Sequence, residues 1–240
     1  PESKRYGGSD RSVEVKRGYR RILSYMETTP GGDTDKQAIR VRQLYEDFDA
    51  DYLVLDLRNG GPAIYYKLAK VMYDESRDCE YSPLTCMNDD GLASAIRADG
   101  AQPVIYAITA SQKLNSTIAN GFRESLSSGS FSFPVSLKVA QDEILPNYSG
   151  YLNGTPEEQV AFEKPFIETQ LMIAETAALV YEKKDQTGLT VIHEQGKNTK
   201  DRYTSVSYGD YFISLLERDL LSDEENDIGF DVKCISAVTL

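Results

Sequence analysis

The feature that most constrains the fold is a short apolar run at residues 52–57, followed by two glycines and a proline. A run of this length, bounded by turn residues, is typical of a strand buried on both faces in an α/β sheet. The glycines allow a sharp corner, and Pro62 suits the first turn of a helix over residues 63–72. Asp56 is therefore expected at the carboxyl end of a central strand, where open α/β sheets carry functional groups. A turn or helix-capping role explains an acid at this position equally well.

The composition describes an ordinary water-soluble chain. Its 240 residues fit one large domain or two small ones, with 40% hydrophobic and 27% charged residues. No apolar run approaches the roughly 18 residues needed to span a bilayer, and no signal peptide begins the sequence. Cys79, Cys86 and Cys234 are too few and too scattered for a disulfide framework or a zinc site. We expect a chain of the reducing cytosol, not secreted, and expect Pro1 to begin a fragment of a longer protein.

Charge is spread unevenly along the chain. The net charge of −12 argues against a protein that coats nucleic acid. Basic residues nevertheless gather within residues 1–26, and acidic residues dominate residues 217–240. A local basic face with an acidic tail elsewhere is compatible with phosphate contact.

The remaining pattern alternates strands and helices. The predicted helices cover residues 34–48, 111–126, 156–184 and 201–221, and the predicted strands cover residues 103–108 and 188–193. Strands separated by helices indicate an α/β fold with a largely parallel core sheet.

Other segments carry weaker signals. Residues 13–28 alternate loosely and are expected to form an extended, hairpin-like segment. Residues 74–102 are expected to form a polar surface excursion with one short helix, and residues 127–151 an insertion or flap. Pro165 is expected to kink or divide the long helix that contains it.

Asp201 is the second acid of interest, because it follows a predicted strand and begins a predicted helix. It is therefore expected to project from the same sheet edge as Asp56. Two converging carboxylates are what a hard divalent cation requires. In two-metal phosphodiester hydrolysis, ions roughly 3.5–4 Å apart activate water and stabilise the leaving oxygen. The alternative role of Asp201 is N-terminal helix capping.

Other catalytic chemistries lack their residues. His193 is the only histidine, and a lone histidine at a strand end is more often structural than a ligand. Without a partner histidine or cysteine for His193, neither zinc chemistry nor a Cys–His dyad is supported. The sequence contains no Gly-x-Ser-x-Gly elbow, dinucleotide fingerprint or phosphate-binding loop.

Several segments together resemble the nuclease domain of phage terminase large subunits. The run Leu-Val-Leu-Asp-Leu-Arg-Asn-Gly-Gly at residues 53–61 resembles the second acidic strand of that domain. The block Lys-Asp-Arg-Tyr-Thr-Ser-Val-Ser-Tyr-Gly-Asp-Tyr at residues 200–211 is similar to its C-terminal acidic helix. Residues 19–28 (Tyr-Arg-Arg-Ile-Leu-Ser-Tyr-Met-Glu-Thr) and 113–116 (Lys-Leu-Asn-Ser) also fit the family. The matches keep the family's order over residues 15–220.

The resemblance implies a function. It implies an RNase H-like fold, with a mixed central sheet flanked by helices, and an endonuclease that uses two Mg²⁺ or Mn²⁺ ions to cut concatemeric double-stranded viral DNA. It also implies an upstream ATPase motor domain, a terminase small subunit and a portal as partners, and the host cytoplasm as location. Asp56 matches the second catalytic, metal-binding acid and Asp201 the third. The strand that carries the first acid has no counterpart, since Asp10 follows no apolar run.

The expected organisation follows from these matches. Residues 1–221 would form an N-terminally truncated nuclease domain without its first acid-bearing strand, weak or inactive alone, and residues 222–240 an acidic tail. Arg58, Arg20 and Arg21 are candidates for DNA contact. The alternative is a non-catalytic α/β scaffold that binds protein partners through its acidic faces, and Mn²⁺ binding would distinguish the two.

Overall fold

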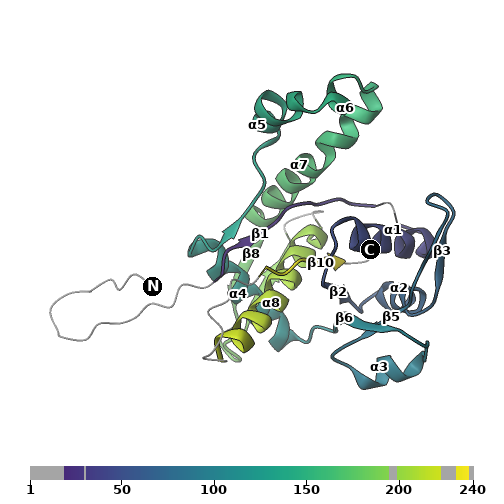
Figure 1. The fold of residues 1–240 in the computed structure, drawn as a ribbon. Coiled ribbons are helices and arrows are strands. Elements are labelled where there is room, and N and C mark those ends of the chain that lie inside the picture. Colours follow the sequence, from purple (N-terminus) through teal and green to yellow (C-terminus); the bar gives the residue numbers. More distant parts are fainter. Residues whose placement is uncertain (1–18, 30, 195–198, 223–230, 238–240) are drawn as a thin grey trace.

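A four-stranded sheet forms the centre of the molecule (Figure 1). The computed structural model describes residues 19–29, 31–194, 199–222 and 231–237. In sheet order the strands are β10 (Cys234–Ala237), β2 (Tyr52–Asp56), β6 (Gln102–Ile108) and β5 (Leu84–Cys86). All three pairings between them are parallel, where the resemblance implied a mixed sheet. The predicted α/β class with a mainly parallel sheet is confirmed.

The centre of β2 is buried on both faces, as its apolar run predicts. Leu53, Val54 and Leu55 are each 0% exposed. Leu53 and Leu55 pack with α1 (Thr34–Asp47) and α2 (Gly61–Leu68) on one face of the sheet. Val54 packs with α4 (Gln112–Ser127) and α8 (Asp201–Ser222) on the other face. Alternation of side chains along the strand therefore divides the apolar core between two helical layers.

The helices begin where capping residues predict. The side chain of Asp33 accepts the backbone N–H groups of Asp35 and Lys36 at the start of α1. Ser111 caps α4 in the same way. These side chains satisfy backbone donors that have no partner within the helix, so local sequence fixes both starts.

The excursion after α2 holds more regular structure than expected. The helix predicted to reach residue 72 ends at Leu68, and β3 (Met72–Asp74) then pairs antiparallel with β4 (Cys79–Tyr81). Strand β5 follows, and then α3 (Asp90–Ala95). Three-residue strands carry too little pattern to be recognised, because their identity depends on the neighbour with which they pair.

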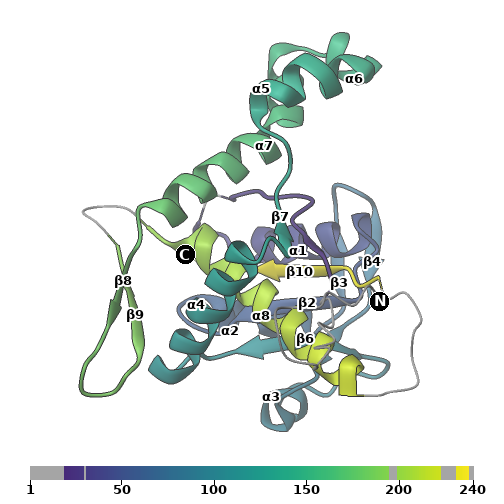
Figure 2. The ribbon, with the colours of Figure 1, turned by 90° about the vertical axis from the view of Figure 1, so that its left-hand side faces the viewer.

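Residues 137–177 form a helical arm that projects from the sheet (Figures 1 and 2). Its long helix is α7 (Pro156–Ala177), with α5 (Leu137–Val139) and α6 (Ser149–Leu152) packed near its start. A π-helical turn at Ala140–Ile144 and a 3₁₀ turn at Leu145–Asn147 join these two short helices. Most of the segment expected to form an insertion or flap, residues 127–151, belongs to the first part of this arm. The expected division at Pro165 is wrong, since α7 is one helix through that residue.

Two small sheets complete the described residues. Strand β8 (Val180–Lys183) pairs antiparallel with β9 (Thr190–His193), so the strand predicted near residues 188–193 lies in a separate hairpin (Figure 2). Strand β1 (Arg21–Ile22) pairs parallel with β7 (Phe131–Ser132).

The two ends of the chain bear on the expected domain boundary. Strand β10 belongs to the central sheet although it falls within the expected acidic tail, so the folded core extends past residue 221. Residues 1–18, 223–230 and 238–240, which hold the rest of that tail and most of the basic N-terminal segment, lie outside the described residues. Across the helices that are described, none combines the length and apolar character of a membrane span.

Candidate functional site

Asp56 ends β2 and is 6% exposed. Its Oδ1 accepts the backbone N–H of Arg58 at 2.9 Å, in a turn where Asn59 has a φ of 52°. Asp56 therefore does stabilise the turn that follows β2, as the alternative role predicted. Among the described residues, no side chain or backbone group donates to the second carboxylate oxygen, which leaves lone pairs available to a ligand.

The surroundings of Asp56 contain little compensating positive charge. Burial raises the pKa of Asp56, while the N–H and charge of Arg58 act in the opposite direction. Burial, with a contribution from the charge of Asp56, also raises the pKa of Tyr208 to about 12. The Tyr208 hydroxyl thus remains protonated, and it donates to Oδ1 of Asn115 at 3.4 Å. A cation beside Asp56 would favour the ionised carboxylate.

Asp201 lies at the same edge of the sheet as the end of β2. Helix α8 runs antiparallel to the strands, as two contacts establish. The Ser205 hydroxyl donates to the carbonyl oxygen of Ser236 at 2.8 Å, and further along α8 the Phe212 ring lies 5.2 Å from the ring of Tyr52. Because Ser236 is near the end of β10 and Tyr52 begins β2, the N-terminus of α8 points to the carboxyl edge.

The carboxylate of Asp201 has no hydrogen bond or ion pair with any residue that the structure describes. In particular, no described N–H of α8 donates to it, so it does not cap its helix there. Burial raises the pKa of Glu175, and the negative charge of Asp201 makes a smaller contribution in the same direction. The adjacent Arg202 is engaged by Glu168 at 2.7 Å and by Glu175 at 3.5 Å.

The three predicted DNA-contact arginines differ in accessibility. The guanidinium of Arg21 is bonded to Asp210, Glu217 and Ser125, and its side chain is only 11% exposed. Arg20 is exposed and donates to Ser132 at 3.2 Å. Arg58 is exposed and stands two residues after Asp56. Arg58 and Arg20 are therefore accessible to solvent, whereas Arg21 serves a buried ion pair.

Asp210 is a buried acid that sequence reasoning missed. It lies inside α8, is 2% exposed, and burial raises its pKa despite the neighbouring Arg21. It stands nine residues after Asp201, about 13 Å along the helix axis, so the two do not share a site. The available signal was an acid within the otherwise apolar face of the final helix.

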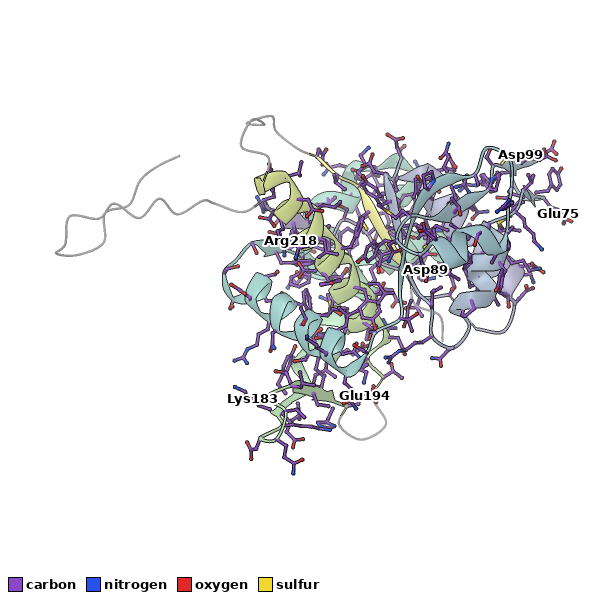
Figure 3. All side chains as sticks on the ribbon, turned by 90° about the horizontal axis from the view of Figure 1, so that it is seen from below. Glu75, Asp89, Asp99, Lys183, Glu194 and Arg218 are labelled. Carbon is purple, nitrogen blue, oxygen red and sulfur yellow. The ribbon has the colours of Figure 1, made fainter. Side chains whose placement is uncertain are left out.

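Charged side chains mark the far ends of the molecule (Figure 3). Glu75 and Asp99 project at one end, and Lys183 and Glu194 at another. His193 belongs to the β8–β9 hairpin, where its Nε2 lies 2.8 Å from Glu182, so the lone histidine has a structural partner.

The carboxyl edge thus supplies two carboxylates and one exposed arginine. Nowhere in the described ranges do three or more His, Cys, Asp or Glu side chains form a metal-binding group. Asp201 also lines a cavity of about 840 Å³ between residues 19–29, α1, α8 and β10. No family model, curated protein or solved structure matches the chain.

Proposed function

We propose that this chain is a nuclease-type domain of a viral DNA-packaging terminase large subunit, with an RNase H-like fold. Its reaction would be hydrolysis of phosphodiester bonds in double-stranded DNA, dependent on Mg²⁺ or Mn²⁺. The observation that carries the proposal is the shared sheet edge of Asp56 and Asp201, whose carboxylates keep oxygen lone pairs that the described residues do not use. The sequence resemblance supports the same assignment. An upstream ATPase domain, a small subunit, a portal and the host cytoplasm belong to the proposal through that resemblance.

The ligand atoms that Asp56 and Asp201 offer are of the type that Mg²⁺ or Mn²⁺ binds. Asp56 and Asp201 offer carboxylate oxygens, the ligands that Mg²⁺ prefers. When bound, the metal would polarise the phosphate and lower the pKa of an attacking water. Two carboxylates supply only two negative charges against the four positive charges of two ions, so weak binding and slow cutting are part of the proposal.

The chain's own side chains would position the substrate. Arg58, exposed beside Asp56, would donate to a phosphate oxygen and fix the DNA backbone at this edge. The Tyr208 hydroxyl, which donates to Asn115 and whose raised pKa reflects burial and the charge of Asp56, would stay neutral when DNA binds. Arg20 follows Tyr19, whose N–H donates to Glu217 near the C-terminal end of α8, so it lies toward the opposite edge of the sheet and would meet the DNA backbone away from this site.

Substitution of Asp56 by asparagine tests the proposal. Mn²⁺ should raise the melting temperature of the wild-type chain, and Asp56→Asn should abolish that increase. The variant's own stability should stay within about 1 kcal/mol of wild type, because an amide oxygen still accepts the Arg58 N–H and no buried charge remains. Thermal melts with and without Mn²⁺ measure both quantities.

Asp99→Asn is the matched control, since Asp99 is exposed at the far end of the molecule (Figure 3). It should leave the Mn²⁺ effect unchanged. If Asp56 is only a turn residue, Asp56→Asn will lower stability and leave the response to Mn²⁺ intact, which refutes the assignment.

A scaffold function is the second candidate, and the helical arm favours it. Four large apolar residues are exposed around α6 and the start of α7: Tyr148, Leu152, Val160 and Phe162. Exposed apolar residues that gather in one place are typical of protein interaction sites. A wild-type chain whose melting temperature does not respond to Mn²⁺ would support this function over the nuclease.

A further inference from the structure

A groove of about 280 Å³ lies between α4 and the β8–β9 hairpin (Figure 2). Two hydrogen bonds hold the hairpin against the helix. The N–H of Thr190 donates to the hydroxyl of Ser116 at 2.8 Å, and the Thr190 hydroxyl donates to Oδ1 of Asn120 at 2.9 Å. A groove of this size has room for about nine water molecules, so it can accept a group as large as a phosphate.

The pairing of the hairpin decides which of its side chains face α4. Lys183 lies opposite Thr190, so its side chain shares the face that meets the helix, and Tyr181 belongs to the same face. Glu182 also lines the groove. It alternates with its two neighbours, however, so its carboxylate is directed to the opposite face, where Nε2 of His193 lies 2.8 Å away. The face toward α4 therefore carries a cation without the adjacent acid.

Two cationic side chains, Arg123 and Lys183, line the groove from opposite sides. The guanidinium of Arg123, on α4, lies over the Tyr181 ring, 5.9 Å from its centroid. Lys183 is exposed on β8. Among the residues that the structure describes, neither cation forms an ion pair or a side-chain hydrogen bond. A guanidinium stacked on a ring still presents its N–H groups in its own plane, so both cations can bind one anion in the groove.

We propose that this groove binds a phosphate group of the DNA backbone. Arginine and lysine side chains, supported by hydroxyl and amide groups such as those of Thr190 and Asn120, are the groups that contact DNA phosphates. Helix α4 connects the groove to the edge of the sheet that carries Asp56. It begins at Gln112, soon after Ile108, the residue of β6 that lies opposite Asp56.

The length of α4 sets the distance between the groove and that edge. Arg123 stands 11 residues after Gln112, about 16 Å along the helix axis. B-DNA advances about 3.4 Å per base pair, so DNA lying along α4 would place the bound phosphate about five base pairs from Asp56. The choice of DNA as the ligand rests on the proposed function, whereas the phosphate site itself does not.

Removal of the two charges tests the groove. Arg123→Gln with Lys183→Gln removes both charges and keeps polar side chains. Lys70→Gln with Arg97→Gln is the matched control, because it removes the same two charges from exposed residues that follow α2 and α3. Fluorescence anisotropy without divalent metal measures the affinity of each full chain for labelled duplex DNA over a range of salt concentrations.

The groove variant should bind DNA roughly tenfold more weakly than wild type, because it loses a hydrogen-bonded contact between charged groups. Its plot of log affinity against log salt concentration should also be shallower by about 0.9, the value for one phosphate contact. The control should change neither quantity. Lys183→Gln alone leaves the contact between Arg123 and Tyr181 intact and should produce part of the loss, so a folding defect in the double variant would not hide the effect.

Thermal melts with inorganic phosphate, at constant ionic strength, identify the other source of the ligand. Suppose that phosphate raises the melting temperature of wild type but not of the groove variant, while the groove and control variants bind DNA equally. The groove then takes a small phosphate compound, and the assignment to DNA is overturned. No difference between the groove and control variants in either measurement would overturn the phosphate site altogether.

Failure of the nuclease proposal has a different signature, because it appears as a wild-type melting temperature that does not respond to Mn²⁺. A response to Mn²⁺ together with equal DNA binding by the groove and control variants would overturn this inference alone.

Discussion

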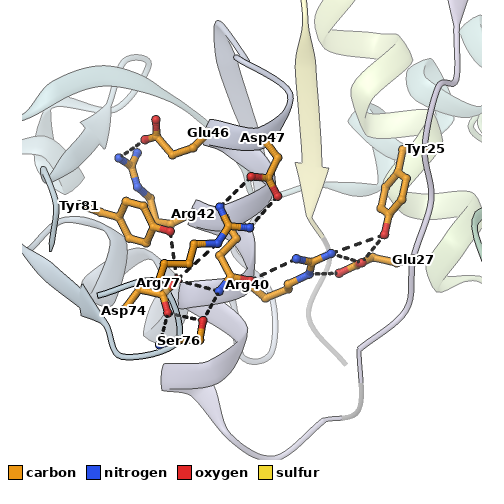
Figure 4. A network of polar contacts seen from close by, with 11 residues as sticks. Tyr25, Glu27, Arg40, Arg42, Glu46, Asp47, Asp74, Ser76, Arg77 and Tyr81 are labelled. Atoms are coloured by element: carbon orange, nitrogen blue, oxygen red, sulfur yellow. Dashed lines mark hydrogen bonds and ion pairs between the residues drawn. The ribbon is translucent and has the colours of Figure 1, made fainter. Parts of the chain in front are cut away.

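At the scale of single residues, buried charges are held by dense hydrogen bonding. Asp74 is 1% exposed, and its carboxylate accepts hydrogen bonds from Ser76, Gln43 and Tyr81 (Figure 4). The hydrogen bonds from Ser76, Gln43 and Tyr81 hold the pKa of Asp74 well below its usual range, although burial acts against them. Asp74 thereby ties the β3–β4 hairpin to α1.

This lowered pKa predicts a pH-dependent stability. The ionised carboxylate stabilises the fold above the unfolded-state pKa of about 4, and this stabilisation is lost as the pH falls toward the folded-state pKa. Asp74→Asn should therefore have a lower free energy of unfolding than wild type at pH 7, and the difference between the two proteins should become smaller below pH 4. Urea denaturation of both proteins at pH 7 and pH 3 measures the difference. A difference of equal size at both pH values would contradict this role.

Arg21 makes a second prediction at this scale. Arg21→Ala would leave Asp210 buried without its cation, which typically costs about 3–5 kcal/mol. Arg20→Ala, one residue away and exposed, should change stability by no more than about 0.5 kcal/mol. Chemical denaturation at pH 7 compares the two variants. A loss below about 1 kcal/mol in Arg21→Ala would show that water or another group solvates Asp210.

The sequence predicted some site residues because their signals are local. Asp56 follows an apolar run and precedes a glycine turn, and Asp201 begins an amphipathic segment. The Arg21–Asp210 pair joins residues 189 positions apart, and no local pattern carries that information. For the same reason, the sequence predicts Arg21 as a DNA-contact residue, although its guanidinium pairs with Asp210 inside the fold.

At the scale of elements, strong local signals set helix starts, and pairing decides the short strands. Helix α7 begins with a capping box, in which Thr155 accepts the N–H of Glu158 and Glu158 accepts that of Thr155. The helix continues through Pro165, whose carbonyl oxygen accepts the Thr169 hydroxyl at 2.8 Å. Strands β5 and β8 were missed because neither is distinct from its surroundings without its neighbour.

The capping box makes the arm's stability testable. Thr155→Ala removes one side-chain acceptor and should cost about 1 kcal/mol, confined to the arm. Hydrogen exchange should accelerate in the first turn of α7 and stay unchanged in the central sheet. Thr117→Ala, on the exposed face of α4, is the control and should alter neither region. Unchanged exchange in α7 after Thr155→Ala would mean that packing, not capping, holds this turn.

At the scale of the whole molecule, the alternation of strands and helices predicted the class but not the sheet order. Strands β2 and β6 were found from apolar runs, and helices α1, α4 and α8 from caps and periodicity. Strand β10 was not found, since Cys-Ile-Ser-Ala has no strong strand pattern and follows an acidic stretch. Its place beside β2 is a property of the assembled core.

The pairing of β10 with β2 has a consequence for synthesis. The N–H of Lys233 binds the Asp51 side chain across 182 positions, so β2 gains this neighbour only when the ribosome has made residues 234–237. At 5–20 residues per second, β2 emerges roughly 10–35 s before β10. During that interval one edge of β2 is open to other nascent chains, and slow translation or a crowded polysome would lower the yield of folded protein.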